Sequence, residues 1–262
     1  MCQSALYQTT ASVIDTPDLV LVVDPNWLPH EVQEIVSYVD TIKGSRPIYL
    51  LFTHSDYDHI IAWQAFPDAI TIASEAFVEN KAKQKEVDQI LEFDDKYYIK
   101  RNYPILYPEI QIVIRQDEEF LSFGQTRIRF WLTPGHNADG LFALLEPQGV
   151  WIAGDYLSDV EFPFIYHSLE DYEMTLEKAS QILSQARPKV LIPGHGQVAQ
   201  HIPEMGNRIR FSQEYLSAIV RHAKGEGEFD EEALLAQYDF PKGLRSIHQD
   251  NLNLIIKSIS KS

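Results

Sequence analysis

The sequence has a single cysteine, Cys2, so no disulfide can form within the chain. It also has no apolar run approaching the ~20 residues that a membrane-spanning helix needs. Its first six residues form neither a basic stretch nor an apolar one, so no secretory signal is recognisable. These absences argue against a secreted protein and against a membrane protein. We therefore expect a soluble, cytoplasmic protein that has no contact with a membrane.

Basic residues are scarce, because 22 lysines and arginines stand against 38 aspartates and glutamates, a formal net charge of −16. Surfaces that bind nucleic acids are normally basic, and no cluster of lysine or arginine stands out. The composition therefore argues against a nucleic-acid partner. Repeats and Gly/Ser-rich linkers are also missing, while 45% of the residues are hydrophobic. We expect one domain spanning residues 1–262 with a sizeable core.

Residues 54–59, His-Ser-Asp-Tyr-Asp-His, contain four metal-binding side chains within six positions. They follow residues 47–53, an apolar and partly β-branched run that predicts a buried strand. Side chains at the end of a strand have rigid support and face a crevice. Imidazole and carboxylate groups are ligands of divalent cations, so this segment predicts a metal centre.

Three later segments share one arrangement, an apolar run that ends in a glycine turn and is followed by one more candidate ligand. Residues 130–135 lead to His136, residues 149–154 lead to Asp155, and residues 190–194 lead to His195. The glycine before each ligand allows a sharp turn or a close backbone approach. The full set of candidate ligands is His54, Asp56, Asp58, His59, His136, Asp155 and His195. Seven ligands are too many for one tetrahedral metal and suit two metals that share a carboxylate.

In order and local sequence, these segments resemble the metallo-β-lactamase fold superfamily, over roughly residues 11–200. Its pattern is Thr-His-x-His-x-Asp-His, then a Pro-Gly-His turn, a Gly-Asp turn and Gly-His-Gly. Residues 53–59 match except at Asp56, where the family usually has its second histidine. The flavodiiron branch is more similar there, since it carries a glutamate. The resemblance implies an α/β fold in the form of a four-layer αββα sandwich, which periodicity by itself does not predict.

The resemblance also implies how the ligands divide between two metals bridged by Asp155. One set is His54, Asp56 and His136, and the other is Asp58, His59 and His195. Two divalent cations held in this way lower the pKa of a shared water toward about 7, and the resulting hydroxide attacks the substrate. Asp58 would be the catalytic carboxylate that orients the hydroxide and passes a proton to the leaving group. Zinc is the expected metal, and the oxygen ligand Asp56 also fits iron or manganese.

Hydrophobic periodicity predicts alternating strands and helices, which indicates an α/β domain. Helices are expected at 29–43, 58–66, 168–186, 203–224, 230–237 and 243–260. Strands are expected within 5–24 and at 47–53, 69–73, 110–115, 118–123, 127–133, 140–146, 149–154 and 189–192. Residues 74–108, a charged helical stretch followed by tyrosines, fit either an inserted cap over the metal crevice or a surface helix packed on the body. Residues 203–262 form a helical C-terminal segment.

Tyr156, Phe164 and His248 are candidate substrate contacts. Tyr156 follows the candidate bridging aspartate, and Phe164 belongs to an aromatic loop after it. His248 lies in a segment that resembles one near the active site of some family hydrolases. Packing in the core is the alternative interpretation of the two aromatic residues.

The predicted function is that of a dinuclear metal-dependent hydrolase acting on an ester, lactone, thioester or related bond of a small molecule. The alternative is a non-haem di-iron protein that binds oxygen or nitric oxide as a reductase or sensor. Asp56 favours that alternative, but the sequence has no flavodoxin-like domain or cysteine-rich electron-transfer module. A phosphodiesterase is the third possibility, and the net charge opposes it when the substrate is a nucleic acid. The sequence leaves the substrate and the oligomeric state open.

Overall fold

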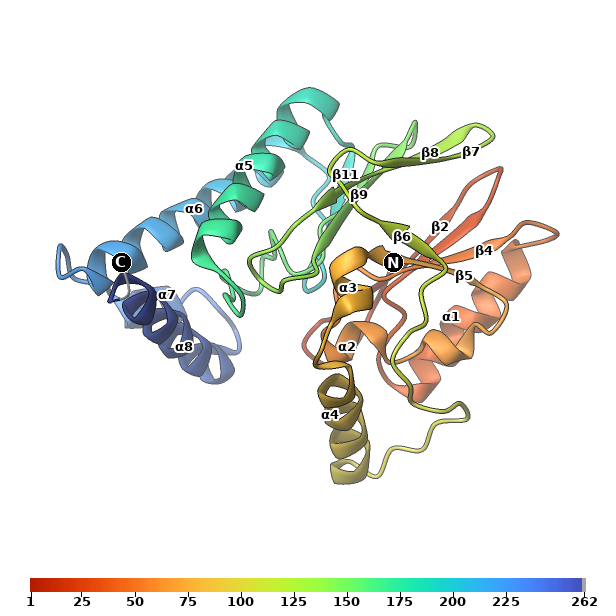
Figure 1. The fold of residues 1–262 in the computed structure, drawn as a ribbon, viewed down its shortest axis with the longest axis horizontal. Helices are drawn as coiled ribbons and strands as arrows, with labels where there is room; N and C mark the ends of the chain where they lie inside the picture. Colours follow the sequence, from red (N-terminus) through yellow and green to blue (C-terminus); the bar gives the residue numbers. More distant parts are fainter. Residues whose placement is uncertain (261–262) are drawn as a thin grey trace.

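Two β-sheets lie face to face in the computed structural model, which describes residues 1–260 (Figure 1). The first sheet has the order β1 (Cys2–Gln3), β2 (Thr10–Asp15), β3 (Val20–Val23), β4 (Ile48–Leu51), β5 (Ile70–Ser74) and β6 (Ile112–Ile114). The second has the order β11 (Val190–Ile192), β10 (Val150–Ile152), β9 (Leu141–Glu146), β8 (Thr126–Leu132) and β7 (Phe120–Phe123). Strands β3 to β6 are parallel, and so are β10 and β11, whereas the other neighbours are antiparallel.

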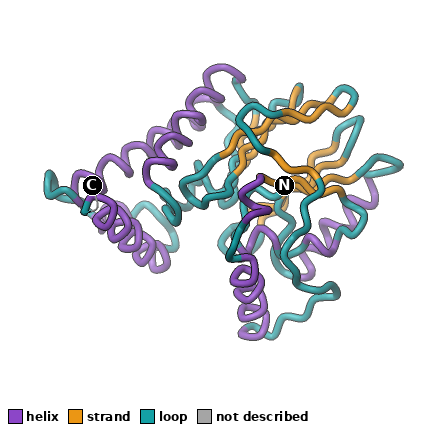
Figure 2. Tube along the Cα trace, in the orientation of Figure 1, coloured by secondary structure: helices purple, strands orange, loops and turns teal. Residues whose placement is uncertain are grey.

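Helices cover the outer face of each sheet (Figure 2). On the side of the first sheet lie α1 (Pro29–Ile42), α2 (Tyr57–Ile60) and α3 (Glu75–Glu79), and α4 (Lys83–Lys96) packs on α2. On the side of the second lie α5 (Leu169–Ala186) and α6 (Ile202–Ala223); α8 (Pro241–Ile259) packs on α6, and α7 (Glu231–Leu235) packs on α8. The α/β fold class is confirmed.

The alternation of apolar side chains along the strands produces the layers. On β3, Leu21 joins the cluster between the two sheets, whereas Val22 packs with the side chains of α1. On β9, Ala143 joins the same inter-sheet cluster, whereas Phe142 packs with the side chains of α5. Each sheet is therefore apolar on both faces, and the layer order is helix, sheet, sheet, helix. This is the αββα sandwich that the family resemblance implies.

The segment expected to form a helix over 58–66 is shorter and broken. Helix α2 ends at Ile60, and a separate 3₁₀ turn spans Trp63–Ala65. Residues 74–108 contain two helices, because Asn80 ends α3 and its side chain accepts a hydrogen bond from Ala82 N at 2.7 Å. Helix α4 packs against α2, which carries two candidate ligands. The cap over the crevice stays a prediction.

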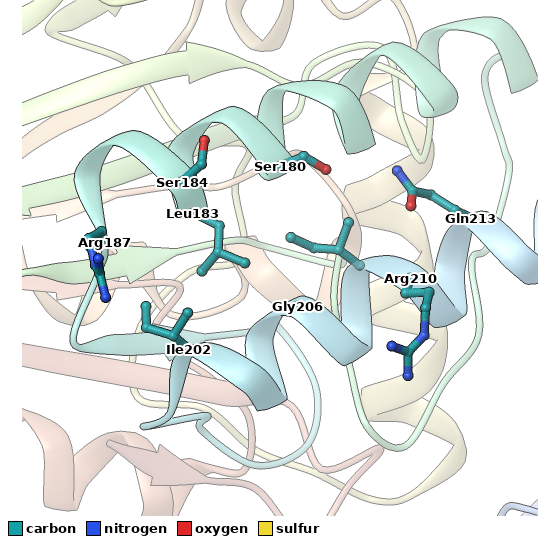
Figure 3. Close-up of a pocket in the computed structure, with 9 residues that line it drawn as sticks. Ser180, Leu183, Ser184, Arg187, Ile202, Gly206, Arg210 and Gln213 are labelled. Atoms are coloured by element: carbon teal, nitrogen blue, oxygen red, sulfur yellow. The ribbon is translucent and has the colours of Figure 1, made fainter.

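None of the helices within residues 1–260 is long and apolar enough to cross a membrane. A groove of about 450 Å³ runs between α5 and α6 (Figure 3). Leu183 and Ile202 give it an apolar wall, while Arg187 and Arg210 lie at its margins. None of its lining residues is a candidate metal ligand, so this groove is separate from the centre described next.

Candidate metal centre

All seven candidate ligands lie on loops or helix starts that follow β4, β8, β10 and β11, at the carboxyl ends of these strands. The structure brings them together in two groups. The first half-site contains His54, Asp56, His136 and Asp155, and the second contains Asp58, His59 and His195. Within each group the potential ligand atoms lie within 4.8 Å of one another. Residues up to 141 positions apart in the chain therefore meet at one point because the strands that carry them end there.

Asp155 lies at the centre and faces the imidazoles of both half-sites. Its Oδ2 is 3.5 Å from His54 Nε2, 3.4 Å from His136 Nε2 and 3.3 Å from His195 Nε2. Its Oδ1 is 3.2 Å from His59 Nε2. Burial would raise the pKa of Asp155, but the surrounding histidines hold it well below its usual range. This carboxylate has the position that a ligand shared by two cations requires.

In His54 and His59, the ring nitrogen that points away from the centre faces a hydrogen-bond acceptor. His59 Nδ1 lies 3.0 Å from the carboxylate of Asp24, which can only accept. The Thr53 hydroxyl donates its one proton to Asp24 at 2.6 Å, so it accepts from His54 Nδ1 at 3.0 Å. Both rings are thereby fixed with the proton on Nδ1, which leaves Nε2 free for a ligand role.

The other two histidines are held in the same tautomer by backbone carbonyls. His136 Nδ1 donates to Phe164 O at 2.9 Å, and His195 Nδ1 donates to Tyr7 O at 2.9 Å. A carbonyl oxygen can only accept, so each Nδ1 carries the proton. All four Nε2 atoms therefore converge on the centre.

Two buried atoms at this centre make no hydrogen bond with any other part of the chain that the structure describes, His54 Nε2 and Asp155 Oδ1. His59 Nε2 and His195 Nε2 also face each other at 3.4 Å. Buried polar atoms without a partner are costly, and a cation would satisfy them. A cavity of about 10 Å³ is lined by residues that include His54, His136 and Asp155. The donor set fits divalent cations that accept nitrogen and oxygen ligands.

Glycines allow this convergence at two of the turns. A Cβ on Gly194 would lie 2.0 Å from Asp155 Oδ1, so only glycine lets the strand end approach that carboxylate. Gly135 has φ +133, and a Cβ there would lie 2.4 Å from Tyr172 Cα. Both turns place their histidines at the cost of excluding every larger residue.

Without bound metal, the carboxylates around the centre raise the pKa values of His54 and His195. Burial and the neighbouring His59 would lower the pKa of His54, but Asp155 and Asp56 outweigh them and raise it to about 9. Burial likewise opposes the charged form of His195, yet Asp155 and Glu161 raise its pKa to about 10. The negative charge that produces these shifts is the charge that would also attract cations.

The sequence profile described as the metallo-beta-lactamase superfamily matches residues 5–195, which is more than half of the chain. The chain belongs to this superfamily. Helices α6 to α8 begin after the matched residues.

Solved structures of the superfamily share the fold. An archaeal metallo-β-lactamase superfamily protein from Sulfolobus tokodaii is 18% identical, with a TM-score of 0.57 over 100% of this chain and 96% of that one. A B3 metallo-β-lactamase described as having an active-site glutamic acid is 18% identical, with a TM-score of 0.57 over 84% of this chain and 86% of that one. A sec-alkyl sulfatase is 12% identical, with a TM-score of 0.62 over 87% of this chain but only 42% of that one.

Two acidic residues of this superfamily member were missed by sequence reasoning. Asp24 follows β3 directly and accepts hydrogen bonds from Thr53 and His59. It follows an apolar run, as His54 does, so a signal existed. Glu161 lies 4.0 Å from His195 Nδ1, and burial raises its pKa to about 7. No local pattern marks Glu161.

Two of the three candidate substrate contacts, Tyr156 and Phe164, adjoin His136. The Tyr156 hydroxyl accepts from His136 N at 2.9 Å and lies 3.0 Å from Pro134 O, so it supports the turn that carries His136. Phe164 holds the same histidine through its backbone carbonyl. His248 is buried, and its Nδ1 lies 3.1 Å from the hydroxyl of Tyr215. A contact of these side chains with substrate stays a prediction.

Proposed function

We propose that this chain is a dinuclear metal-dependent hydrolase acting on a small molecule with an ester, lactone, thioester or related bond. The observation that carries the proposal is the convergence of four Nε2 atoms, each fixed by a hydrogen bond at Nδ1, on one central carboxylate. Such preorganisation has little use in a packed core, where polar groups pair with each other instead. It is the arrangement that lets a protein bind cations without rearranging its ligands.

In the proposed centre, His54, Asp56 and His136 would hold one divalent cation, and the second half-site would hold the other. Asp155 would be available to both. Bound cations of this kind polarise a substrate oxygen and lower the pKa of water toward about 7. Zinc is the first choice for the metal, and iron or manganese also fits because Asp56 adds an oxygen ligand.

Asp58 is proposed as the catalytic carboxylate. Its Oδ2 lies 3.5 Å from His195 Nε2 and 3.6 Å from His59 Nε2, and the hydroxyl of Thr9 lies 3.3 Å away. The carboxylate is therefore fixed at the edge of the second half-site. There it takes the proton of the attacking water and returns it to the leaving group.

The second candidate function is a non-haem di-iron protein that binds oxygen or nitric oxide. Asp56 supports it, since its Oδ2 lies 3.2 Å from His136 Nε2 and 3.5 Å from His54 Nε2, where the family usually has a histidine. However, a β-lactamase neighbour is described as having an active-site glutamic acid. A carboxylate in the active site is thus compatible with hydrolysis on this fold, and we keep the hydrolase as the first proposal.

A hydrolysis assay tests the proposal with a panel of esters, lactones, thioesters and phosphodiesters. We expect turnover of at least one class, loss of it after chelation, and recovery when zinc, manganese or iron(II) is returned. Asp58→Asn should lower kcat about 100-fold or more, while the exposed control Asp40→Asn should leave it unchanged. Iron in the purified protein with an absorbance that responds to oxygen, and no turnover of the panel, would instead support the di-iron candidate.

A further inference from the structure

We propose that Asn251, on the C-terminal helix α8, is a positioning residue for the first half-site. It acts through the backbone of residues 163–165, whose middle carbonyl fixes the imidazole of His136. This inference rests on the proposed metal centre and adds to it a residue that lies outside the part of the chain that the family profile matches.

The first step is the contact between His136 and the loop. Phe164 O accepts from His136 Nδ1 at 2.9 Å, and Tyr166 N donates to His136 O at 2.9 Å. The ring of Tyr166 also lies against that imidazole, with centroids 5.1 Å apart. The direction in which His136 Nε2 points therefore depends on where the Phe164 carbonyl lies.

The second step is the contact between Asn251 and the residues on either side of Phe164. Asn251 Oδ1 accepts from Ile165 N at 2.9 Å, and Asn251 Nδ2 donates to Pro163 O at 2.6 Å. One amide side chain thus bonds the backbone before and after the carbonyl that holds His136. Neither Ile165 N nor Pro163 O makes another hydrogen bond within the described residues.

The third step is what fixes Asn251 itself. Its second amide proton goes to the hydroxyl of Tyr215 on α6 at 2.9 Å, and His248 Nδ1 lies 3.1 Å from that hydroxyl. The ring of Tyr215 stacks on Phe162, at the start of the same loop. Asn251 is 0% exposed. Helices α6 and α8 lie on the same side of the sheets (Figure 1), and together they hold the amide in one orientation.

Neither imidazole of the second half-site is hydrogen-bonded to residues 163–165 in the described chain, although Glu161 lies 4.0 Å from His195 Nδ1. His195 Nδ1 bonds to Tyr7 O, and His59 Nδ1 bonds to Asp24, both in the N-terminal part of the chain. A change at Asn251 should therefore affect His136 more than His195. This difference provides an internal control within a single molecule.

Asn251→Ala tests the inference, with Asn253→Ala as an exposed control on the same helix. Ile255→Ala is the control for stability, because Ile255 is a fully buried apolar residue one turn further along α8. Each protein is labelled with ¹⁵N-histidine and titrated with zinc. The ring-nitrogen signals of His136 and His195 then report the two half-sites separately, and the exchange of each Nδ1 proton with water reports its hydrogen bond.

We expect Asn251→Ala to weaken zinc binding at the first half-site about tenfold and to speed exchange of the His136 Nδ1 proton, with smaller changes in both His195 signals. Equal effects on His136 and His195, no effect on either, or the same loss at His136 in Ile255→Ala would overturn the inference. A wild-type protein that binds none of zinc, manganese and iron(II) would sink the proposed function itself. Two bound zincs in both wild type and Asn251→Ala, at equal affinity, would sink only the role of Asn251.

Discussion

The two half-sites share Asp155 but are supported by different parts of the molecule. The second is held mainly from the N-terminal part of the chain, where Tyr7, Thr9 and Asp24 contact its ligands. The first is held in part by a loop between β10 and α5, which α8 supports in turn. Their exposure differs too, since the Asp56 side chain is 23% exposed and that of Asp58 is 10% exposed.

The two groups of ligands therefore need not respond to a substitution as one unit. The second is held mainly from the N-terminal part of the chain, so it should respond less to changes in α8. The first depends on helices that follow the region shared with the family, so its affinity can be tuned without rebuilding the fold. Substitutions at Asp155, Asp24 and Asp56 test this difference between the half-sites.

Asp155→Ala should impair both half-sites equally, because it removes the one carboxylate that faces all four imidazoles. We expect metal content to fall at both half-sites and activity to be lost. Elemental analysis measures the metal content per chain. Asp68→Ala, an exposed position, is the matched control. Retention of full metal content by Asp155→Ala would contradict the assignment of this residue.

Asp24→Asn should act mainly on the second half-site, because Asn can no longer hold His59 Nδ1 with a full negative charge. We expect metal affinity there to fall about 10- to 100-fold. A smaller loss should appear at the first half-site, since Asp24 also orients Thr53, which contacts His54. Chelator competition measures both affinities. A larger loss at the first half-site would reverse the proposed dependence.

Asp56→His should change metal preference at the first half-site alone. It restores the usual family pattern and replaces an oxygen ligand with a nitrogen ligand, which favours zinc over manganese. We expect the zinc-to-manganese affinity ratio to rise on the order of tenfold, worth about 1.4 kcal/mol. Competitive titration with the two metals measures it. An equal change in the ratio at the second half-site would argue against separate half-sites.

The metal-free protein should lose stability as pH rises from 7 to 10. Its folded-state pKa values of about 9 for His54 and about 10 for His195 exceed the unfolded value of about 6.5. Their contribution is fully present below the unfolded value and is lost as pH rises through 9 and 10. Thermal unfolding should show the midpoint falling by about 2–4 °C per kcal/mol lost. The metal-loaded protein should show a flatter profile, because bound cations replace the protons. A profile that rises with pH in the metal-free protein would show that these histidines are not stabilised as cations.

Local patterns were enough to predict the strands from β2 onward, the α/β fold and the set of residues that meet at the centre, but not the two-residue strand β1. His54, His136 and His195 each follow an apolar run directly, so their place at a strand end was visible from neighbours in the chain. The four-layer order came from the family resemblance and is confirmed. The shorter α2 was not foreseen, because its boundary depends on packing against α4.

Most of the hydrogen bonds that hold the candidate ligands in place could not be predicted from the sequence. The contact between Asn251 and Ile165 joins residues 86 positions apart, and no periodicity encodes such a pairing. His248 was predicted as a substrate contact from resemblance, but its bond to Tyr215 depends on how α6 and α8 cross. Hydrogen bonds of this kind are fixed by tertiary packing, which a pattern in one sequence does not record.

The most direct test of the account is elemental analysis of the wild-type protein, purified without added metal or chelator and counted per chain. Two divalent cations per chain are predicted, because two groups of ligands with free Nε2 atoms share one carboxylate. A single cation would leave the first half-site, with its unusual Asp56, without a role. No bound cation, even after zinc, manganese or iron(II) is supplied, would contradict the dinuclear centre on which the proposed function depends.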